Sequence, residues 1–269
     1  MTIQIYWDPI PHLGPIPVNW YGLTFALGIL VGSRVVLRRA PRFDVSKERV
    51  EELLIWIVVG TIAGARLYFI AQNDFLEYLR QPWRILAVWE GGLAFFGGLA
   101  GATLAAFLYS QLRGLPFARL ADLVAPAIPI GGAIGRTSCG LDGMDYGTAT
   151  RLPWSVIYTH PRSYAPVDGI SRHPTQFYEL TGDLLIAWIL LRVRGKLRDG
   201  DLFRLYLVLF SLLRFLLFFV RGDVPVIALG LKNGQWTALL FFALTLTSFV
   251  IARSRRTASH ATLPQSQRN

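Results

Sequence analysis

The sequence has little charge and almost no cysteine for its length. Only 16% of its 269 residues are Asp, Glu, Lys or Arg, whereas soluble domains carry about 25%. Its single cysteine, Cys139, excludes an internal disulfide framework and a metal site built from several cysteines. We therefore expect neither a disulfide-stabilised secreted domain nor a zinc module, and we expect no metal and no cofactor.

Two further features are missing. The N-terminal stretch MTIQIYWDPIPHLGPIPVNWYG has no basic segment ahead of an apolar run, so we expect no cleavable signal peptide. The sequence has no recognisable internal repeat, and inverted repeats are the usual mark of secondary transporters, so a transporter is less favoured. Membrane insertion would then depend on the first apolar block itself.

The apolar residues, 53% of the chain, are gathered in long blocks, and the mean hydropathy is +0.41. A helix needs roughly 20 mostly apolar residues to cross about 30 Å of hydrocarbon. The blocks predict an all-α integral membrane protein with about seven transmembrane helices around a lipid-facing cavity. We expect one transmembrane domain over 1–252 and a disordered, basic tail over 253–269. The expected spans are 19–37, 52–71, 92–111, 119–135, 177–193, 203–220 and 234–252.

Basic residues between the blocks predict an orientation. The larger share of the 27 Lys and Arg residues falls in loops on one side of the spans, and such an excess is typical of the cytoplasmic side. The N-terminus and the long loop 136–176 are then outside, and the C-terminal tail is cytoplasmic. The net charge of +10 is spread among the loops and not concentrated in one patch, so nucleic acid is not an expected partner.

Two arginines stand in or beside apolar spans. Arg214 lies near the middle of LVLFSLLRFLLFFVRGD, and Arg136 follows the Gly- and Pro-rich run LADLVAPAIPIGGAIG. A charge at membrane depth costs about 2.5–3.5 kcal/mol and usually faces an interior cavity. We expect Arg136 at the end of the fourth span, where the backbone turns irregular, and we expect both guanidiniums to bind a phosphate through their planar forks. The alternative for Arg214 is an ion pair with Glu179 or Asp183.

Other motifs leave two interpretations each. Arg66, in GTIAGARLYFIA, either faces a site or extends towards the outer interface. His173, in RHPTQFYEL, is either a general base or a capping residue. The glycines of WEGGLAFFGGLAG allow close approach of another helix or of a ligand. The glycines of the run 131–147 either let backbone amides approach a lipid headgroup or form an irregular surface turn. Cys139 is expected to be a small buried residue.

In this order, the motifs resemble those of the prolipoprotein diacylglyceryl transferase family. The resemblance implies transfer of a diacylglyceryl group from phosphatidylglycerol to the lipobox cysteine of a prolipoprotein signal peptide, with release of glycerol 1-phosphate. It further implies action from the outer leaflet of the bilayer of a bacterial plasma (inner) membrane. The similar segments are NWYGLTFALG, GARLYFI, VWEGGLAFFGGLAG, GAIGRTSCGLDGMDYG, RHPTQFYE, RFLLFFVRGD and NGQW.

The resemblance also implies site residues. Arg136 and Arg214 match two essential arginines and are the expected catalytic pair. The residues expected to bind substrate are Tyr21, Arg66, Gly91, Gly97, Cys139, Asp142, Gly147, His173, Gln176, Tyr178, Glu179 and Arg221.

The sequence departs from the family pattern at four positions. Phe96 stands where the family has a proposed base histidine, Met144 and Phe218 stand where it has acids, and Cys139 replaces a signature asparagine. The open alternative is a relative with altered or lost catalysis that binds or moves an anionic lipid or phosphate. The candidate substitutes for the missing base are Asp142, Asp145, Glu90 and His173.

Overall fold

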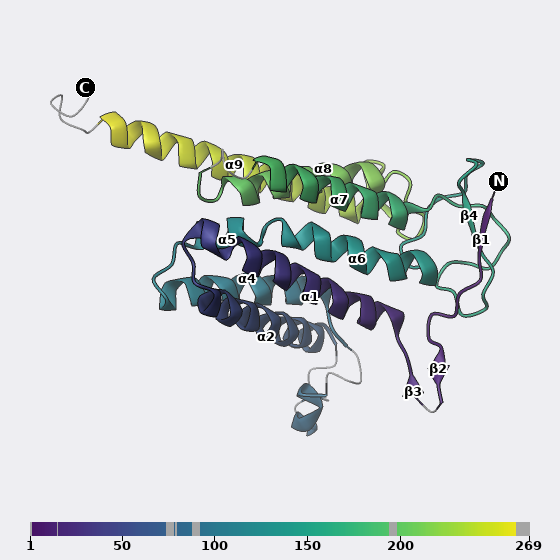
Figure 1. The fold of residues 1–269 in the computed structure, drawn as a ribbon. Helices are drawn as coiled ribbons and strands as arrows, with labels where there is room; N and C mark the ends of the chain where they lie inside the picture. Colours follow the sequence, from purple (N-terminus) through teal and green to yellow (C-terminus); the bar gives the residue numbers. More distant parts are fainter. Residues whose placement is uncertain are drawn as a thin grey trace. The chain divides into compact units, whose positions relative to one another are not determined.

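The protein is mostly helical in the computed structural model, which describes residues 2–14, 16–73, 78, 80–87, 92–193 and 198–261 (Figure 1). Helices coincide with all seven expected spans, and the fourth span is divided between α5 and α6. The helices are α1 (Trp20–Arg39), α2 (Lys47–Gln72), α4 (Phe95–Leu112), α5 (Phe117–Val124), α6 (Ala127–Asp142), α7 (Thr175–Val193), α8 (Asp201–Leu217) and α9 (Asn233–Ala261). Two short 3-10 helices are η1 (Ala40–Phe43) and η2 (Pro82–Ile85).

Several of these helices have the length and composition of membrane spans. Among the described residues, three segments are long and apolar enough to cross a membrane, namely Trp20–Phe43, Lys47–Gln72 and Phe117–Asp142. Phe96–Leu112 is a shorter apolar helix. The number of crossings and the orientation remain predictions.

The all-α prediction is incomplete, because short strands pair in three places. β1 (Ile3–Ile5) pairs in parallel with β4 (Val156–Tyr158), β2 (His12–Leu13) pairs with β3 (Ile16–Pro17), and β5 (Val226–Ala228) pairs with β6 (Leu231–Lys232). Strands of two or three residues are too short to show the alternation of apolar and polar residues that reveals a strand in a sequence.

Helix α6 corrects the expectation of an irregular backbone after Arg136. The helix continues through Arg136 and stops at Gly143, whose φ of 84° is left-handed and typical of a helix C-terminus. Its glycines are weak helix formers, but they allow close packing against α7. A Cβ atom on Gly140 would lie 2.8 Å from Cζ of Phe177, so only glycine fits this contact. Tertiary packing therefore outweighs the low intrinsic helix propensity.

The chain divides into two compact units. Unit 1 comprises Met1–Gly32 and Ala125–Asn269, and unit 2 comprises Ser33–Val124. Within unit 1, α6 packs on α7, α7 on α8 and α8 on α9 (Figure 1). Its α9 continues to Ala261, while 262–269 lie outside the described residues. The single transmembrane domain over 1–252 and the disordered tail over 253–269 remain predictions.

Within unit 2, glycines allow α2 and α4 to pack closely. A Cβ atom on Gly64 would lie 2.8 Å from Cα of Gly101, and one on Gly60 would lie 2.7 Å from the carbonyl oxygen of Gly101. A Cβ atom on Gly97 would overlap both the Gly64 backbone and the Cβ atom of Tyr68. These contacts support the helix-packing interpretation of WEGGLAFFGGLAG, and the substrate-binding role of Gly97 remains a prediction.

Gly64→Ala is expected to lower the free energy of unfolding by about 1–3 kcal/mol, because the added methyl group meets backbone atoms that cannot rotate away. Chemical denaturation in detergent measures this change. Gly22→Ala is the matched control, since Gly22 is also helical and its added Cβ atom meets nothing within 4 Å. Equal stability of the two variants would contradict the packing argument.

Candidate functional site

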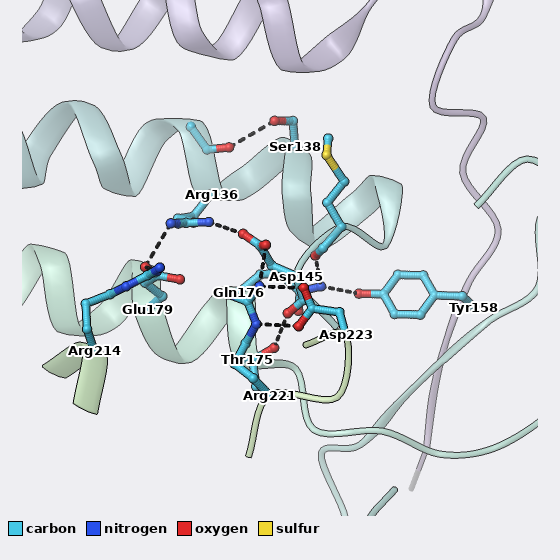
Figure 2. Close-up of polar contacts among 12 residues, drawn as sticks. Arg136, Ser138, Asp145, Tyr158, Thr175, Gln176, Glu179, Arg214, Arg221 and Asp223 are labelled. Atoms are coloured by element: carbon cyan, nitrogen blue, oxygen red, sulfur yellow. Dashed lines mark hydrogen bonds and ion pairs between the residues drawn. The ribbon is translucent and has the colours of Figure 1, made fainter. Parts of the chain in front are cut away.

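Three arginines and three carboxylates form a continuous set of ion pairs in unit 1, which we term the arginine–carboxylate network (Figure 2). Helices α6, α7 and α8 and the segments that follow α6 and α8 supply its members. They are Arg136, Asp145, Glu179, Arg214, Arg221 and Asp223.

Glu179 joins the two predicted catalytic arginines. Its Oε1 atom accepts a hydrogen bond of 2.8 Å from Nη2 of Arg136 and a second one from Nη1 of Arg214. The Glu179 side chain is 3% exposed, while each arginine side chain is 23% exposed. The ion-pair interpretation of Arg214 is therefore confirmed, with Glu179 as its partner.

Asp183, the other acid considered for Arg214, is buried in α7 one turn beyond Glu179. Among the described residues it forms no ion pair or hydrogen bond. One of its carboxylate oxygens lies 2.9 Å from the position of a Cβ atom on Gly132, so the glycine leaves room for this buried acid. Asp183 thus lies beside the network and does not pair with Arg214.

Asp145 joins Arg136 to Arg221. Its carboxylate accepts from Nη1 of Arg136 and, at 2.6 Å, from Nη2 of Arg221. Burial alone would raise the pKa of Asp145, but the guanidiniums of Arg136, Arg221 and Arg214 outweigh burial and lower it. A carboxylate with a lowered pKa accepts protons poorly, so its chemistry argues against Asp145 as a substitute general base.

Asp145→Asn is expected to lower the free energy of unfolding by on the order of 1–3 kcal/mol at neutral pH, because a neutral amide replaces a carboxylate bound by two guanidiniums. The pKa of Asp145 is lowered in the folded state. This stabilisation is therefore complete above about pH 4, near the pKa of an unfolded aspartate, and is lost as the pH falls through the lower folded-state pKa. Circular dichroism of both proteins across this range measures the effect, and a difference that persists unchanged in acid would contradict it.

Arg221 is the most enclosed arginine of the network, with a side chain 5% exposed. It forms a two-pronged pair with Asp223, through Nε to Oδ1 at 2.7 Å and Nη2 to Oδ2 at 2.6 Å. Burial alone would lower the pKa of Arg221, but Asp223 and Asp145 raise it, so the residue stays charged. Arg221 also forms a backbone bridge with Gly147. This geometry fits an arginine that joins the segment after α8 to the loop after α6.

Gly147 lies between two other segments at this bridge. Its neighbour Thr148 donates its N–H to the carbonyl of Val220 at 2.8 Å, and His173 donates its N–H to the carbonyl of Thr148 at 3.0 Å. A Cβ atom on Gly147 would lie 2.5 Å from Cβ of His173. The predicted site residue Gly147 is therefore required by close backbone approach, whatever its contact with substrate.

The segment RHPTQFYEL forms the start of α7 and supports the loop after α6. Gln176 is buried and donates to the carbonyl of Met144 at 2.5 Å and to the hydroxyl of Tyr158 at 3.2 Å, and Tyr158 in turn donates to the carbonyl of Gly140 at 3.0 Å. The Gln176 amide thereby holds the chain on both sides of Gly143.

His173 and Tyr178 lie beside one another. Nδ1 of His173 is 3.4 Å from the hydroxyl of Tyr178, which accepts a 2.7 Å hydrogen bond from Nε1 of Trp154. Burial lowers the pKa of His173 and so favours its neutral form. Among the described residues, neither side chain is hydrogen-bonded to the network, so a proton transfer from His173 to this site would need an intervening group.

The other predicted residues of unit 1 lie along α1 and α6. Cys139 and Asp142 are buried, and Oδ1 of Asp142 has no hydrogen-bond partner among the described residues. Tyr21 is exposed and stacks on Phe25 with ring centroids 6.2 Å apart. One turn further, α1 is tied to α6 by a 2.8 Å hydrogen bond from Thr24 to Ser138.

Arg66 lies in unit 2 and has a structural role there. Its guanidinium donates to the backbone carbonyls of Arg84, Ile85 and Gly92 at 2.6, 3.1 and 3.2 Å. The residue is 4% exposed, which contradicts the interpretation of an arginine that extends towards the outer interface, one of the two left open by the sequence. Its substrate-binding role remains a prediction, and Gly91 and Glu90 lie outside the described residues.

The sequence interpretation did not include Asp223 in the site. Its position two residues after Arg221, directly beyond the expected end of the sixth span, was an available signal. Among the described residues, no group of three or more His, Cys, Asp or Glu side chains is placed to hold a metal ion.

A family model described as prolipoprotein diacylglyceryl transferase matches residues 9–251. A phosphatidylglycerol–prolipoprotein diacylglyceryl transferase of Nostoc sp. is 36% identical over 245 residues, which cover 87% of this chain and 85% of the relative. Proteins of the same name from Methylobacillus flagellatus and Cupriavidus necator are 32% and 31% identical, over 89% and 98% of this chain and 94% and 99% of the relatives.

Proposed function

The chain belongs to the prolipoprotein diacylglyceryl transferase family, and on this premise we propose that Arg136 and Arg214 bind the phosphate of its lipid substrate. The protein transfers a diacylglyceryl group from phosphatidylglycerol to a prolipoprotein. The observation that carries the proposal is the meeting of two guanidiniums, from α6 and α8, at one oxygen atom of Glu179. The Glu179 carboxylate thereby holds the guanidiniums of Arg136 and Arg214 together in the absence of substrate.

The two arginines retain hydrogen-bonding capacity for an anion. Among the described residues, Arg214 donates only through Nη1, and Arg136 donates through Nη1 and Nη2. A guanidinium has five N–H donors, so several remain for phosphate oxygens. The partial exposure of both side chains also favours access by a headgroup. Arg221 is more enclosed and doubly paired, which supports a structural role for it.

The chemistry of the transfer requires positive charge beside the leaving group. The thiol sulfur of the prolipoprotein attacks the glyceryl carbon that bears the phosphate, a carbon–sulfur bond forms, and the carbon–oxygen bond to phosphate breaks. Glycerol 1-phosphate leaves with the bonding electron pair, and the thiol proton passes to solvent or to the released phosphate. Arginines held beside that oxygen stabilise the charge that develops on it. A thiol with a pKa of about 8.5 is already a few per cent ionised near neutral pH, which reduces the demand on a base.

We also propose a position in the membrane. Seven spans, with the N-terminus outside and the C-terminus in the cytoplasm, would place the loop 136–176 and the arginine–carboxylate network towards the outer leaflet of a bacterial plasma (inner) membrane. The bias of basic residues supports this orientation. Phosphatidylglycerol would then enter from the bilayer, and the lipobox of a signal peptide would meet it on the outer side.

Transfer is tested with purified protein in detergent, phosphatidylglycerol carrying radiolabelled acyl chains, and a lipobox peptide. We expect label on the peptide, and none on a peptide whose lipobox cysteine is replaced by serine. Phosphatidylglycerol labelled only in its headgroup glycerol should leave the peptide unlabelled. Label on the peptide from the headgroup would contradict the proposed bond cleavage.

A further inference from the structure

Phe218 lies against two arginines of the network. The ring centroid of Phe218 is 4.7 Å from Cζ of Arg214 and 5.1 Å from Cζ of Arg221. Both distances are within the range of a cation–π interaction. Phe218 caps the C-terminus of α8 and is only 3% exposed, so the ring meets both guanidiniums away from bulk water.

The ring of Phe218 is held in this position by the start of α9. A Cβ atom on Gly234 would overlap the ring and lie 2.6 Å from its Cδ1 atom, so glycine leaves the space that the ring fills. Gln235 ties the same turn to α8 by donating to the carbonyl of Phe215 at 3.3 Å. Phe218 is therefore a fixed support against which the guanidiniums rest.

A guanidinium that rests on an aromatic ring keeps more of its charge and hydrogen-bonding capacity than one paired with a carboxylate. The face of a ring attracts a guanidinium without accepting its N–H groups and without cancelling its charge. The network already matches three guanidiniums with three carboxylates. The ring of Phe218 therefore supports Arg214 and Arg221 without adding a fourth negative charge to the network.

We propose that Phe218 is a positioning residue of the transferase, which fixes the guanidinium of Arg214 and leaves its N–H donors available to the lipid phosphate. The inference rests on the proposed function of Arg214. Phe218 acts through Arg214 and has no direct contact with the reacting atoms. Removal of the Phe218 ring should therefore lower kcat/KM for phosphatidylglycerol and leave the KM for the peptide substrate unchanged.

The test compares initial rates of Phe218→Leu, Phe215→Leu and the unmodified protein. In Phe218→Leu we expect kcat/KM for phosphatidylglycerol to fall about tenfold, a loss within the range of a desolvated cation–π contact, with KM for the lipobox peptide unchanged. Phe215→Leu is the matched control, because Phe215 lies one turn earlier on α8, packs on Phe219, and should change activity less than about twofold.

A double variant separates positioning from general packing. When Arg214 is already alanine, Phe218→Leu should reduce the residual rate by less than about twofold, because the residue through which it acts is gone. Full activity of Phe218→Leu, an equal loss in Phe215→Leu, or an undiminished loss in the double variant would each overturn the proposal. Full activity of Arg214→Ala alone would instead show that the proposed phosphate-binding function of Arg214 is wrong.

Discussion

Replacing Arg136 or Arg214 with alanine is expected to reduce kcat for diacylglyceryl transfer by about a hundredfold or more. Loss of one group that stabilises charge on a leaving or tetrahedral oxygen commonly costs about 3–4 kcal/mol of activation free energy. Both arginines bind the same oxygen atom of Glu179. Loss of either one therefore leaves a site with a single guanidinium at that oxygen. The measurement is the initial rate of peptide labelling at saturating phosphatidylglycerol.

Two further variants give this prediction its controls. Arg136→Lys keeps the charge but loses the planar fork, so its activity should lie between those of alanine and arginine. Arg162→Ala should change the rate less than about threefold, because Arg162 forms an exposed pair with Asp8 and such pairs contribute little. A loss below about threefold in Arg136→Ala or Arg214→Ala would remove that arginine from the phosphate site.

Glu179→Ala is expected to lower the free energy of unfolding by about 3–5 kcal/mol, the usual effect of removing one partner from a buried ion pair. The variant leaves Arg136 and Arg214 facing each other without the carboxylate that both bind. Like charges in a partly buried site repel, so the two guanidiniums would oppose each other at the position where Glu179 now joins them. Thermal or chemical unfolding in detergent measures the loss.

Glu179→Gln provides the comparison for Glu179→Ala. The amide keeps the side-chain volume and one acceptor oxygen. The free energy of unfolding should therefore fall clearly less in Glu179→Gln than in Glu179→Ala. Asp8→Asn is the surface control and should cost less than about 1 kcal/mol, because its pair with Arg162 is exposed. If Glu179→Ala were no less stable than Asp8→Asn, Glu179 would not be the residue that holds the two arginines together.

Much of the fold could be predicted from the apolar blocks, because their lengths match the thickness of a membrane. The irregular backbone expected after Arg136 was wrong, because glycine lowers helix propensity, while the contact between Gly140 and Phe177 that favours the helix joins residues distant in the sequence. The pairing of β1 with β4 also joins residues distant in the sequence. Strands β2, β3, β5 and β6 pair locally, but they are too short for an alternation of apolar and polar residues to reveal them.

Part of the site could be predicted because a charged side chain in an apolar segment is costly unless it has a partner or a function. That argument pointed to Arg136 and Arg214 and to Glu179 as a partner, and the structure brings the three together. It did not anticipate that backbone carbonyls bind the guanidinium of Arg66, because carbonyls leave no signature in a sequence. It also left out Asp223, because the pairing of Asp223 depends on the direction in which the Arg221 guanidinium points.

The pairing of β1 with β4 restricts how the chain threads the membrane. Ile3 lies beside Val156 and Ile5 beside Tyr158, so both strands must be on the same side of the bilayer. The chain therefore crosses an even number of times between them. If α1, α2 and α4 each cross once, as the sequence predicts, this parity requires α5 and α6 together to count as a single crossing. The break between these two helices would then be a bend inside one span, and the pairing of β1 with β4 would test the predicted topology of the chain between residues 5 and 156.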